Sequence, residues 1–443
     1  MLRSVETVIV TKFGGSSLAD AAQFIKVKNI LAMDSERKFV VPSAPGKRGP
    51  GDDKITDLLY AAHAAASAGK THRHLLERIR ARYEEIAEEL HISFDLQTEF
   101  DEIDRALQKG ASRDYAASRG EYLNGKLLAA YLGFPFVDAK EVIRFSKDGR
   151  LLEEETNALI SERLSSLARA VIPGFYGADE DGVIHTFSRG GSDVSGALVA
   201  RAVNADIYEN WTDVTGFRMA DPRIVPDAQY IATITYRELR ELSYMGATVL
   251  HEEAVFPVRK AGIPTNIRNT NDPRHPGTMI RANLGQDNAH IITGIAGHKG
   301  FSIVSVEKDM MNAELGFGRR VLQAFEEYGI SFEHLPTGID TMCVVVHEKE
   351  LAPHKEEILA RIKELVEPDQ VTVSEHLALI ATVGRGMVRA FGTAARLFTA
   401  ISSQGISIRT IDQGSSELNI IVGVDEDDFE PAIKAIYDAF VRT

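Results

Sequence analysis

The chain is poor in the features that mark secreted, cysteine-bound metal or membrane-spanning proteins. It has a single cysteine, Cys343, among its 443 residues, so an internal disulfide and a cysteine-based zinc cluster are both excluded. No apolar run approaches the roughly 20 residues that a membrane-spanning helix needs. The first residues, MLRSVETVIVTKFGG, lack the long apolar core and the small-residue cleavage site of a signal peptide. We therefore expect a cytoplasmic protein with no membrane partner.

An excess of positive charge is missing as well. The formal net charge is −14 at pH 7 and the sequence pI is near 5.5, which disfavours binding to nucleic acid or to an anionic membrane surface. With 44% hydrophobic and 26% charged residues, the composition is that of an ordinary globular protein. The length predicts two to four domains.

The G-x-x-x-x-G-K-[ST] pattern of nucleotide-binding P-loops is also absent, but other glycine turns follow predicted strands. The β-branched run at residues 7–10 predicts a buried strand that leads through Lys12 to Gly14 and Gly15, and residues 19–33 have helical spacing. A lysine at the mouth of a glycine turn could bind phosphate. A solvated lysine beside an ordinary turn is the alternative.

A second glycine turn lies in the stretch from His185 to Arg223. A strand is expected to run into residues 188–191, Ser192 stands where a helix N-cap belongs, Asp193 falls in the first turn, and residues 194–203 form the helix. Two consecutive glycines before a helix N-terminus make a seat for an anion. A tight turn before an ordinary capped helix is the alternative.

Polar or glycine residues follow four predicted strands. Besides Lys12, they are Ser43 after the strand 39–41, Gly174 after the apolar run 170–173, and Thr212 with Asp213 after the strand that begins at Ala205. Ends of this kind converge on a ligand crevice in an open α/β sheet. Helices are expected at 54–69 and 115–132, with a charged amphipathic pair between 72 and 108 that breaks near residues 91–94.

The segments that carry these features are similar to those of a known family. KFGGSS (12–17), SRGGSD (188–193) and WTDVTGFRMADPR (211–223) resemble the amino-acid kinase family, and more narrowly the aspartate kinases; VVPSAPGKRG, RGEYLNGKLLAAYLG, VIPGFYG and IRNTNDPRHPGT support this in the same order. The resemblance covers essentially the whole chain. It implies a carbamate-kinase-like, three-layer α/β sandwich around a mainly parallel sheet, over residues 1–284.

The resemblance gives catalytic roles to Lys12, Gly14, Gly15 and Asp193. Lys12 would contact the transferring phosphoryl group, and the two glycines would offer backbone donors to it. The nucleophile would be the β-carboxylate of aspartate, which is already ionised at neutral pH. Asp193 is therefore expected to orient Lys12 rather than to abstract a proton.

An aspartate-binding site is implied by the same resemblance. Arg189 would bind the α-carboxylate with a bidentate fork, and Glu121 would bind the α-ammonium group. The remaining substrate-contacting positions match Ser43, Thr56, Phe175 and Ser192.

The implied cofactors are ATP and Mg²⁺, with the metal ion held mainly through the nucleotide phosphates and no separate metal site on the protein. Positions that match nucleotide contacts are Lys12, Gly15, Thr212, Asp213, Arg218, Arg223, Thr248 and Val249. Two of them depart from the family, because many relatives have tyrosine in place of Arg218 and lysine in place of Thr248. Arg218 could instead stack on the nucleotide or pair with it.

An internal repeat follows residue 283. Residues 291–346 read as strand, glycine turn, helix and strand, and residues 377–424 repeat that order, each with a further helix behind it. The pair resembles two ACT domains, which are ferredoxin-like ligand sensors that associate side by side. We expect a first ACT domain at 290–370, completed by the C-terminal residues, and a second at 371–443, with the chain assembling into a homodimer or homotetramer through them.

The first of these units also matches the effector-binding positions of the family. They are Met311, Glu314, Gly316, Gly318, Ser331, Phe332 and Glu333. An acid at Glu333 could hold an ammonium group of a bound amino acid. Lysine is the expected effector and threonine the alternative, since Gly338 and Ile339 replace the polar and acidic residues of lysine-sensitive relatives.

The activity implied by the resemblance is ATP-dependent phosphorylation of L-aspartate at the entrance to lysine, threonine and methionine synthesis, under feedback by an end product. The alternatives are a kinase for another amino acid such as glutamate, an amino-acid sensor without catalysis, and a nucleotide-binding scaffold. The pair of Glu121 with Arg189 disfavours the first, and the presence of Lys12 with Asp193 disfavours the second.

Overall fold

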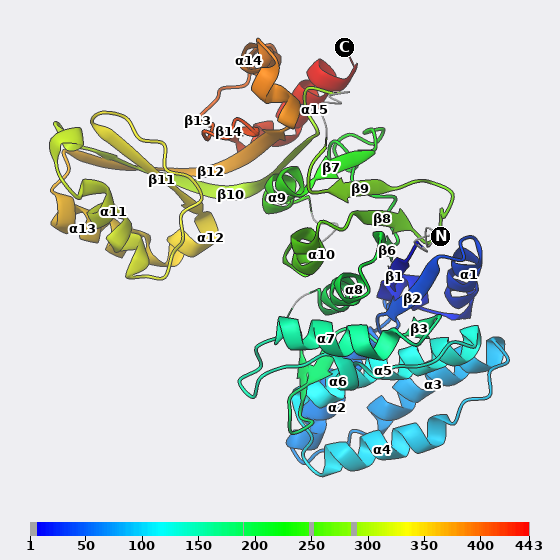
Figure 1. The fold of residues 1–443 in the computed structure, drawn as a ribbon. Coiled ribbons are helices and arrows are strands. Elements are labelled where there is room, and N and C mark those ends of the chain that lie inside the picture. Colours follow the sequence, from blue (N-terminus) through cyan, green and yellow to red (C-terminus); the bar gives the residue numbers. More distant parts are fainter. Residues whose placement is uncertain (1–6, 189, 248–251, 285–289, 443) are drawn as a thin grey trace. The chain divides into compact units, whose positions relative to one another are not determined.

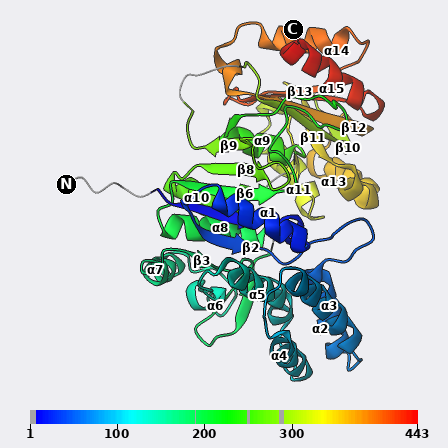
Figure 2. The ribbon, with the colours of Figure 1, turned by 90° about the vertical axis from the view of Figure 1, so that its right-hand side faces the viewer.

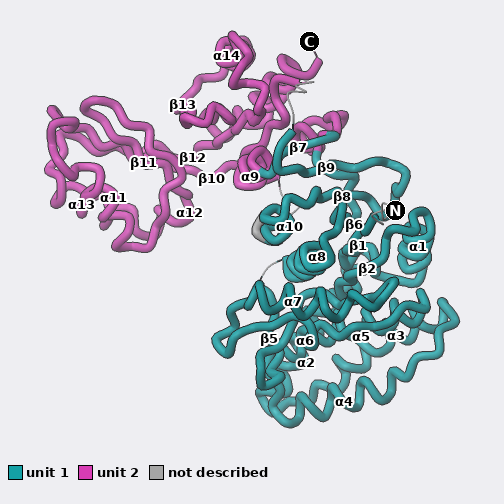
Figure 3. The backbone as a smooth tube through the Cα atoms, viewed as in Figure 1, with its two compact units in different colours: residues 1–217, 232–236, 249–284 teal, residues 218–231, 237–248, 285–443 magenta. Residues whose placement is uncertain are grey.

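The computed structural model describes residues 7–188, 190–247, 252–284 and 290–442. The chain forms two compact units (Figure 3): unit 1 comprises Met1–Phe217, Ala232–Tyr236 and Val249–Leu284, and unit 2 comprises Arg218–Ile231, Arg237–Thr248 and Gly285–Thr443. Three residues with predicted roles, Arg189, Thr248 and Val249, lie outside the described residues. No helix in the described ranges has the length and apolar character to cross a membrane.

Unit 1 is built on a seven-stranded sheet in the order β3-β2-β1-β6-β8-β9-β7, whose strands from β9 down to β3 lie one above another in Figure 2. All neighbours pair in parallel except β8 and β9. Strands covered on both faces need near-continuous apolar runs, and β1 is buried along its whole length. The strands are β1 (Ile9–Phe13), β2 (Arg37–Pro42), β3 (Ala170–Val171), β6 (Ile207–Thr212), β7 (Thr233–Thr235), β8 (Thr265–Asn269) and β9 (Thr278–Arg281).

Helices cover both faces of this sheet, which gives the expected three layers. On one face, Phe13, Val40 and Trp211 join a core with α1 (Ala21–Ala32), α2 (Ile55–Ser67), α3 (Arg73–Glu89), α4 (Leu96–Gln108) and α5 (Arg113–Leu132). On the other, α8 (Gly191–Ala202) packs on β1, β2 and β6 and against α7 (Glu153–Leu164) and α10 (Phe256–Ala261). Figure 1 shows α1 and α8 on opposite sides of β1 and β2.

The smaller elements of unit 1 lie in its connections. They are η1 (Gly15–Leu18), α6 (Ala139–Val142), η2 (Glu252–Val255) and a hairpin of β4 (Tyr176–Ala178) with β5 (Ile184–Thr186). Helix α9 (Tyr236–Tyr244) begins in unit 1 and continues into unit 2.

Unit 2 contains one antiparallel sheet in the order β11-β10-β12-β14-β13. Its two longest strands, β10 (Gly294–Glu307) and β12 (Gln370–Val383), pair with each other along most of their length. The second half of β10 pairs with β11 (Thr341–His347), and the second half of β12 pairs with β14 (Asn419–Asp425), which pairs in turn with β13 (Thr410–Asp412). The two repeats therefore share one continuous sheet.

Each repeat has its own helices. The first contains α11 (Phe317–Glu326), α12 (Glu348–Leu351) and α13 (Lys355–Val366), and the second contains α14 (Thr393–Ser402) and α15 (Phe429–Tyr437). Short 3-10 turns are η3 (Met311–Ala313), η4 (Ala352–His354), η5 (Arg385–Arg389) and η6 (Glu426–Asp428), and the chain ends in the π-helical turn η7 (Asp438–Arg442).

The C-terminal residues do not complete the first repeat, contrary to our prediction. Among the described residues, the core of the first repeat has no member beyond Val373. Helix α15 packs instead against α14, β10 and β12. The second repeat is therefore completed by the first half of β10, because that half pairs with the second half of β12.

Unit 2 also holds two segments that fall inside the span 1–284 expected for the first domain. The Met219 carbonyl accepts the Ile295 N–H at 2.6 Å, and the Tyr437 hydroxyl accepts the Gln229 N–H at 2.9 Å. Glu238, in α9, is fully buried and accepts a bond from the Thr293 hydroxyl at 2.6 Å. Residues 218–231 and 237–248 thus pack with the repeats.

Candidate active site

The carboxyl ends of the central strands of unit 1 are joined edge to edge by backbone hydrogen bonds. Gly174 donates to the Pro42 carbonyl at 3.1 Å, Ser43 to Phe13 at 3.0 Å, Gly14 to Trp211 at 3.0 Å and Thr270 to Thr212 at 2.9 Å. These bonds follow from the parallel register, in which Lys12 lies opposite Val41 on one side and Asn210 on the other. The strand ends that the sequence predicted to converge do converge.

The glycine turn after β1 fits against the loop after β2. A Cβ added to Gly15 would lie 2.9 Å from the Ala44 carbonyl oxygen and 3.1 Å from the Gly46 nitrogen, and the Gly46 N–H donates to the Gly15 carbonyl at 2.8 Å. Any side chain at Gly15 would separate these two loops. Glycine is needed at this position for close approach of two backbones.

The backbone N–H of Gly14 does not have the role predicted for it. Its N–H donates to the Trp211 carbonyl, so in this conformation that amide is not available to a phosphate. A Cβ at Gly14 would lie 3.6 Å from Lys12 Nζ, which is an ordinary contact distance. Gly14 therefore acts as a link between β1 and β6 beside the lysine.

A buried charged cluster holds Trp211 in place beneath this turn. Glu209 is 3% exposed, pairs with Arg37 at 2.8 Å and with Arg268 at 3.2 Å, and accepts the Trp211 indole N–H at 2.8 Å. Both guanidinium groups lie over the indole ring. The residue that accepts the Gly14 N–H is thus fixed from several sides.

Lys12 and Asp193 form an ion pair of 2.6 Å between Nζ and Oδ1, and neither side chain is more than 15% exposed. The prediction that Asp193 orients Lys12 therefore agrees with their contact. The same carboxylate oxygen also accepts the Asn210 side-chain amide at 2.7 Å. We did not single out Asn210 from the sequence, although its position two residues before Thr212 on a strand parallel to β1 could have indicated it.

Helix α8 begins two residues earlier than the sequence indicated. Its N-cap is Gly190, in the left-handed conformation with φ 55°, and not Ser192, which lies in the first turn with Asp193. A Cβ at Gly191 would lie 2.5 Å from the Phe175 ring, and one at Gly174 would lie 2.6 Å from the Ser192 Cβ. Gly191 and Gly174 thus allow the N-terminus of α8 to pack against the loop after β3. The left-handed Gly190 takes the place of the capping hydroxyl that we predicted.

Phe175 occupies a backbone conformation that is strained for its side chain. Its φ is 78°, which costs a non-glycine residue on the order of 1–2 kcal/mol. The buried Ser195 hydroxyl accepts the Phe175 N–H at 3.0 Å and donates to the Gly191 carbonyl at 3.0 Å. The strain is maintained by the first turns of α8, next to the predicted substrate residue Ser192.

Glu121, from α5, is the most perturbed acid beside the lysine. Burial raises the pKa of Glu121 to about 8, against the opposing effects of the Ala44 and Glu121 backbone N–H groups and of the Lys12 charge. Its Oε2 makes no hydrogen bond with any described residue. A buried carboxyl group that is only partly satisfied is suited to binding a cation.

Two further predicted residues lie near this acid. Ser43 follows β2 and is half-buried, and Thr56 is half-buried in the first turn of α2. The amide of Asn124 donates to the Ser43 carbonyl at 2.6 Å. Asn124 is one helical turn beyond Glu121, so the i, i+3 spacing of the two could have indicated it.

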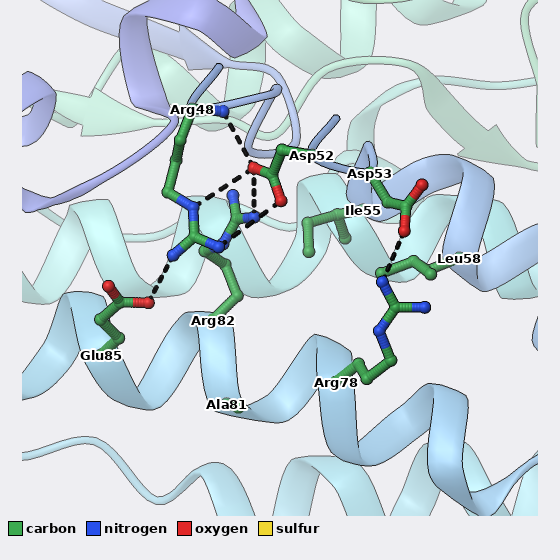
Figure 4. A pocket seen from close by; sticks show the side chains of 9 residues that line it. All are labelled: Arg48, Asp52, Asp53, Ile55, Leu58, Arg78, Ala81, Arg82 and Glu85. Atoms are coloured by element: carbon green, nitrogen blue, oxygen red, sulfur yellow. Dashed lines mark hydrogen bonds and ion pairs between the residues drawn. The ribbon is translucent and has the colours of Figure 1, made fainter. Parts of the chain in front are cut away.

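The loop between β2 and α2 is clasped to α3 beside a pocket of about 200 Å³. Figure 4 shows Arg82 and Arg48 converging on Asp52, with Arg48 also reaching Glu85, while Arg78 pairs with Asp53. Arg82 is buried and also donates to the Ala19 and Gly46 carbonyls at 3.3 and 3.2 Å. One guanidinium group therefore joins both loops that approach Lys12.

Some of the residues predicted to contact the nucleotide belong to unit 1, some belong to unit 2, and some lie outside the described residues. Thr212 ends β6 and donates to Asp213 at 3.1 Å in unit 1. In unit 2, Arg218 donates to the Ala228 carbonyl at 3.0 Å and stacks on Tyr230, and the exposed Arg223 pairs with Asp221 at 2.6 Å. Arg189, Thr248 and Val249 lie outside the described residues.

The predicted effector positions lie in the first repeat of unit 2. Gly316 is the left-handed N-cap of α11, Glu314 pairs with Lys308 at 2.7 Å and with Arg320, and Met311 is buried beside them. Ser331 and Phe332 are exposed. Gly318 lies 3.6 Å, measured to an ideal Cβ, from the Met342 sulfur.

Glu333, the predicted partner of an effector ammonium group, is already engaged. It accepts a hydrogen bond from the Tyr244 hydroxyl of α9, and its other oxygen lies 3.4 Å from the His347 Nε2. Burial and the Glu333 carboxylate raise the pKa of Tyr244 to about 12, so the phenol remains a donor over the physiological range.

The unit 1 site combines groups that can bind an anion with a buried acid that can bind a cation. Lys12, the glycine turn and the N-terminus of α8 present positive charge and donors suited to phosphate groups, and Glu121 presents a buried acid. In the ranges that the structure describes, no three or more His, Cys, Asp or Glu side chains gather as a metal site.

The chain is similar to known proteins in both sequence and fold. Residues 7–269 match the model of the amino acid kinase family, and residues 380–440 match that of an ACT domain. Aspartokinase 3 of Bacillus subtilis is 40% identical over 97% of this chain and 98% of its own length. Among solved structures, the aspartate kinase of Clostridium acetobutylicum is 50% identical with a TM-score of 0.92, covering 98% of this chain and 100% of that one. Escherichia coli aspartokinase III, in complex with lysine and aspartate, is 25% identical with a TM-score of 0.74, covering 98% and 99%.

Proposed function

The chain belongs to the amino acid kinase family and, within it, to the aspartokinases, and from that premise we propose that it transfers the γ-phosphoryl group of ATP to the β-carboxylate of L-aspartate. The product is 4-phospho-L-aspartate. The observation that carries the proposal is the buried, partly satisfied Glu121 beside the Lys12–Asp193 pair, which offers one seat for an amino acid's ammonium group and another for phosphate.

The phosphoryl transfer requires no general base. The reference pKa of the attacking carboxylate is about 4, so it is ionised at neutral pH. The barrier comes from bringing two anions together, and Lys12 with Gly15 and the α8 N-terminus stabilises the charge that spreads over the phosphoryl oxygens. Asp193 fixes the direction in which the Lys12 ammonium group points. Bound Mg²⁺ would supply further charge neutralisation on the nucleotide phosphates.

Recognition of aspartate rests on two opposite charges. Glu121 would receive the α-ammonium group at its unpartnered oxygen, and Arg189 would bind the α-carboxylate. The remaining residues proposed to line the aspartate site are Ser43, Thr56, Phe175 and Ser192. A Cβ added to Gly174 would lie 2.6 Å from the Ser192 Cβ, so the loop after β3 and the first turn of α8 are in close contact here.

For the nucleotide, we propose contacts from Thr212, Asp213, Arg218, Arg223, Thr248 and Val249, with Lys12 and Gly15 at the phosphates. Arg218 already stacks on Tyr230 and hydrogen-bonds its hydroxyl at 2.8 Å. A guanidinium group held flat in this way is suited to stacking on a base.

We further propose that lysine is the feedback effector and that the reaction opens lysine, threonine and methionine synthesis. The E. coli relative that was solved with lysine supports this choice, as does Glu333, an acid in the predicted effector region. The lysine would compete with Tyr244 and His347 for that carboxylate. Threonine is the alternative, since it needs only an α-ammonium partner.

We propose that unit 1 carries the kinase domain and unit 2 two ACT repeats, the second completed by the first half of β10, and that the chain forms a homodimer or homotetramer through these repeats. Large apolar side chains exposed in unit 2 support such an assembly. Leu315 is 94% exposed, Ile339 is 69% exposed, and Phe391 is fully exposed. Large apolar side chains left exposed on a monomer are often found at protein interfaces.

The test is ADP release with ATP and Mg²⁺, measured with aspartate, with glutamate and with no acceptor, each with and without lysine or threonine. We expect release that depends on aspartate and falls when lysine is added. Release with glutamate alone would indicate another amino-acid kinase. ATP binding without release on any acceptor would indicate a sensor or a scaffold.

A further inference from the structure

One carboxylate oxygen of the predicted active site is shared by two donors from neighbouring strands. Asp193 Oδ1 lies 2.6 Å from Lys12 Nζ of β1 and 2.7 Å from Asn210 Nδ2 of β6. Asn210 is 4% exposed. Lys12 and Asn210 are register partners in the parallel sheet, so both side chains emerge on the same face of the sheet, toward α8.

A second residue of β6, Tyr208, binds the backbone of the same aspartate. The Tyr208 hydroxyl donates to the Asp193 carbonyl at 3.1 Å. Alternate residues of a strand face the same side, and Tyr208 and Asn210 are two apart. A Cβ at Gly196 would lie 2.6 Å from the Tyr208 hydroxyl, so α8 rests closely on this strand. The first turn of α8 is thus fixed to β6 through both its backbone and its carboxylate.

This arrangement decides where the Lys12 ammonium group points. A carboxylate held by lysine alone can rotate with it, because both side chains have free torsions. The amide of Asn210 carries no charge and cannot titrate, so it fixes the carboxylate without competing with Lys12 for its charge. A displacement of about 1 Å at a reacting group can cost on the order of 10²-fold in rate.

We propose that Asn210 is a positioning residue for phosphoryl transfer, which holds Asp193 so that Asp193 aims Lys12 at the transferring group. The inference rests on the proposed function and deepens it. The charged or titratable groups that face the trio are Lys12 itself from β1, Glu121 from α5, which interacts electrostatically with Lys12, and Tyr208 from β6.

The experiment compares three full-length variants with the parent chain. Asn210→Leu keeps the branching and the number of non-hydrogen side-chain atoms and removes the donor. Asn210→Asp puts a second carboxylate against Asp193. Asn266→Leu is the matched control, because Asn266 is 8% exposed on the adjacent strand β8 and is paired with Glu209 rather than with Asn210, on the opposite face. For each, kcat, both KM values, the pH profile and the melting temperature are measured.

We expect Asn210→Leu to lower kcat at least tenfold with the KM for ATP changed less than threefold, and Asn266→Leu to keep kcat within threefold of the parent. In Asn210→Asp, two adjacent carboxylates would share a proton, so the acid limb of the kcat profile should move upward by at least one pH unit. A purely structural role would move the melting temperature but not that limb.

Two outcomes overturn the proposal. One is an active parent with kcat and pH profile unchanged in both Asn210 variants. The other is an equal loss of kcat in Asn210→Leu and Asn266→Leu, which would indicate general damage to the sheet. If Asn210→Leu does not fold, the pH profile of Asn210→Asp decides alone. An inactive parent with every acceptor would instead remove the proposed function, so the two failures are distinguishable.

Discussion

Glu121 combines full burial, a raised pKa and an unpartnered oxygen, and together these predict how aspartate binds. Since the pKa of Glu121 is about 8 in the free protein, the acid is mostly protonated at pH 7. It must ionise to pair with the substrate ammonium group, so binding of aspartate should release close to one proton. Calorimetry at pH 7 in two buffers of different ionisation enthalpy measures this, with Glu121→Gln as the control that releases none.

The same group affects stability with a definite sign. Its folded pKa lies above its unfolded value, so the folded state binds the proton more tightly, and this contribution is lost as pH rises from about 4.5 through about 8. The melting temperature of Glu121→Gln minus that of the parent should therefore increase between pH 5 and pH 9. A constant difference over this range would contradict the raised pKa.

Lys12 is predicted to act mainly in the transition state. Lys12→Ala should lower kcat about 10²- to 10³-fold, the range found when a single charge-stabilising donor is removed, and should weaken ATP binding much less. Steady-state kinetics with separate measurement of ATP affinity distinguish the two. A loss of equal size in affinity and in turnover would place Lys12 in ground-state binding only.

At the scale of elements, the clasp between the β2–α2 loop and α3 predicts a stability effect linked to activity. Arg82→Met removes the donor that joins Ala19, Gly46 and Asp52. It should lower the free energy of unfolding by roughly 2–4 kcal/mol, because it leaves a partly buried carboxylate and two carbonyl groups with fewer donors. It should also lower kcat, because Gly46 contacts Gly15.

Arg78→Met is the control for this prediction. Arg78 lies one turn earlier on α3, and its pair with Asp53 is half exposed on both sides, so its removal should cost less than about 1 kcal/mol. Urea unfolding combined with activity assays measures both variants. If the two cost the same, the buried clasp has no special role.

The elements also show what a sequence can and cannot predict. Apolar periodicity and glycine turns placed β1, α5 and the paired helices α3 and α4, because these depend on local burial and on breakers. The predicted start of α8 was two residues too late, since its cap is the left-handed Gly190 rather than the Ser192 hydroxyl.

Other errors came from long-range packing. The donor role of Gly14 was wrong because the strand register gives its N–H to Trp211. Asn210 was missed because its partner Asp193 is on another element, and only parallel pairing brings the two together. The C-terminal residues were assigned to the first repeat from the resemblance to ACT domains, whereas the long pairing of β10 with β12, which the sequence does not show, makes the first half of β10 part of the second repeat.

At the scale of the whole molecule, regulation is predicted to depend on Glu333. If lysine is the effector, Glu333→Gln removes the charge that would hold its ammonium group and should raise the lysine concentration for half-inhibition at least tenfold. Glu327→Gln is a suitable control, because Glu327 is exposed in the same repeat and pairs with Arg361 away from the predicted positions. Inhibition curves for lysine and threonine are compared; equal lysine sensitivity in parent and Glu333→Gln would exclude this acid.

The central claim is that a lysine from β1 and an acid from α5 hold a nucleotide phosphate and an amino-acid ammonium group in one site of unit 1. It is tested most directly by trapping the product with hydroxylamine, which converts an acyl phosphate into a coloured hydroxamate complex with iron. The account predicts hydroxamate formation that requires ATP and aspartate in the parent chain and is lost in both Lys12→Ala and Glu121→Gln. Hydroxamate formed equally well by either variant, or formed from glutamate but not aspartate, would contradict it.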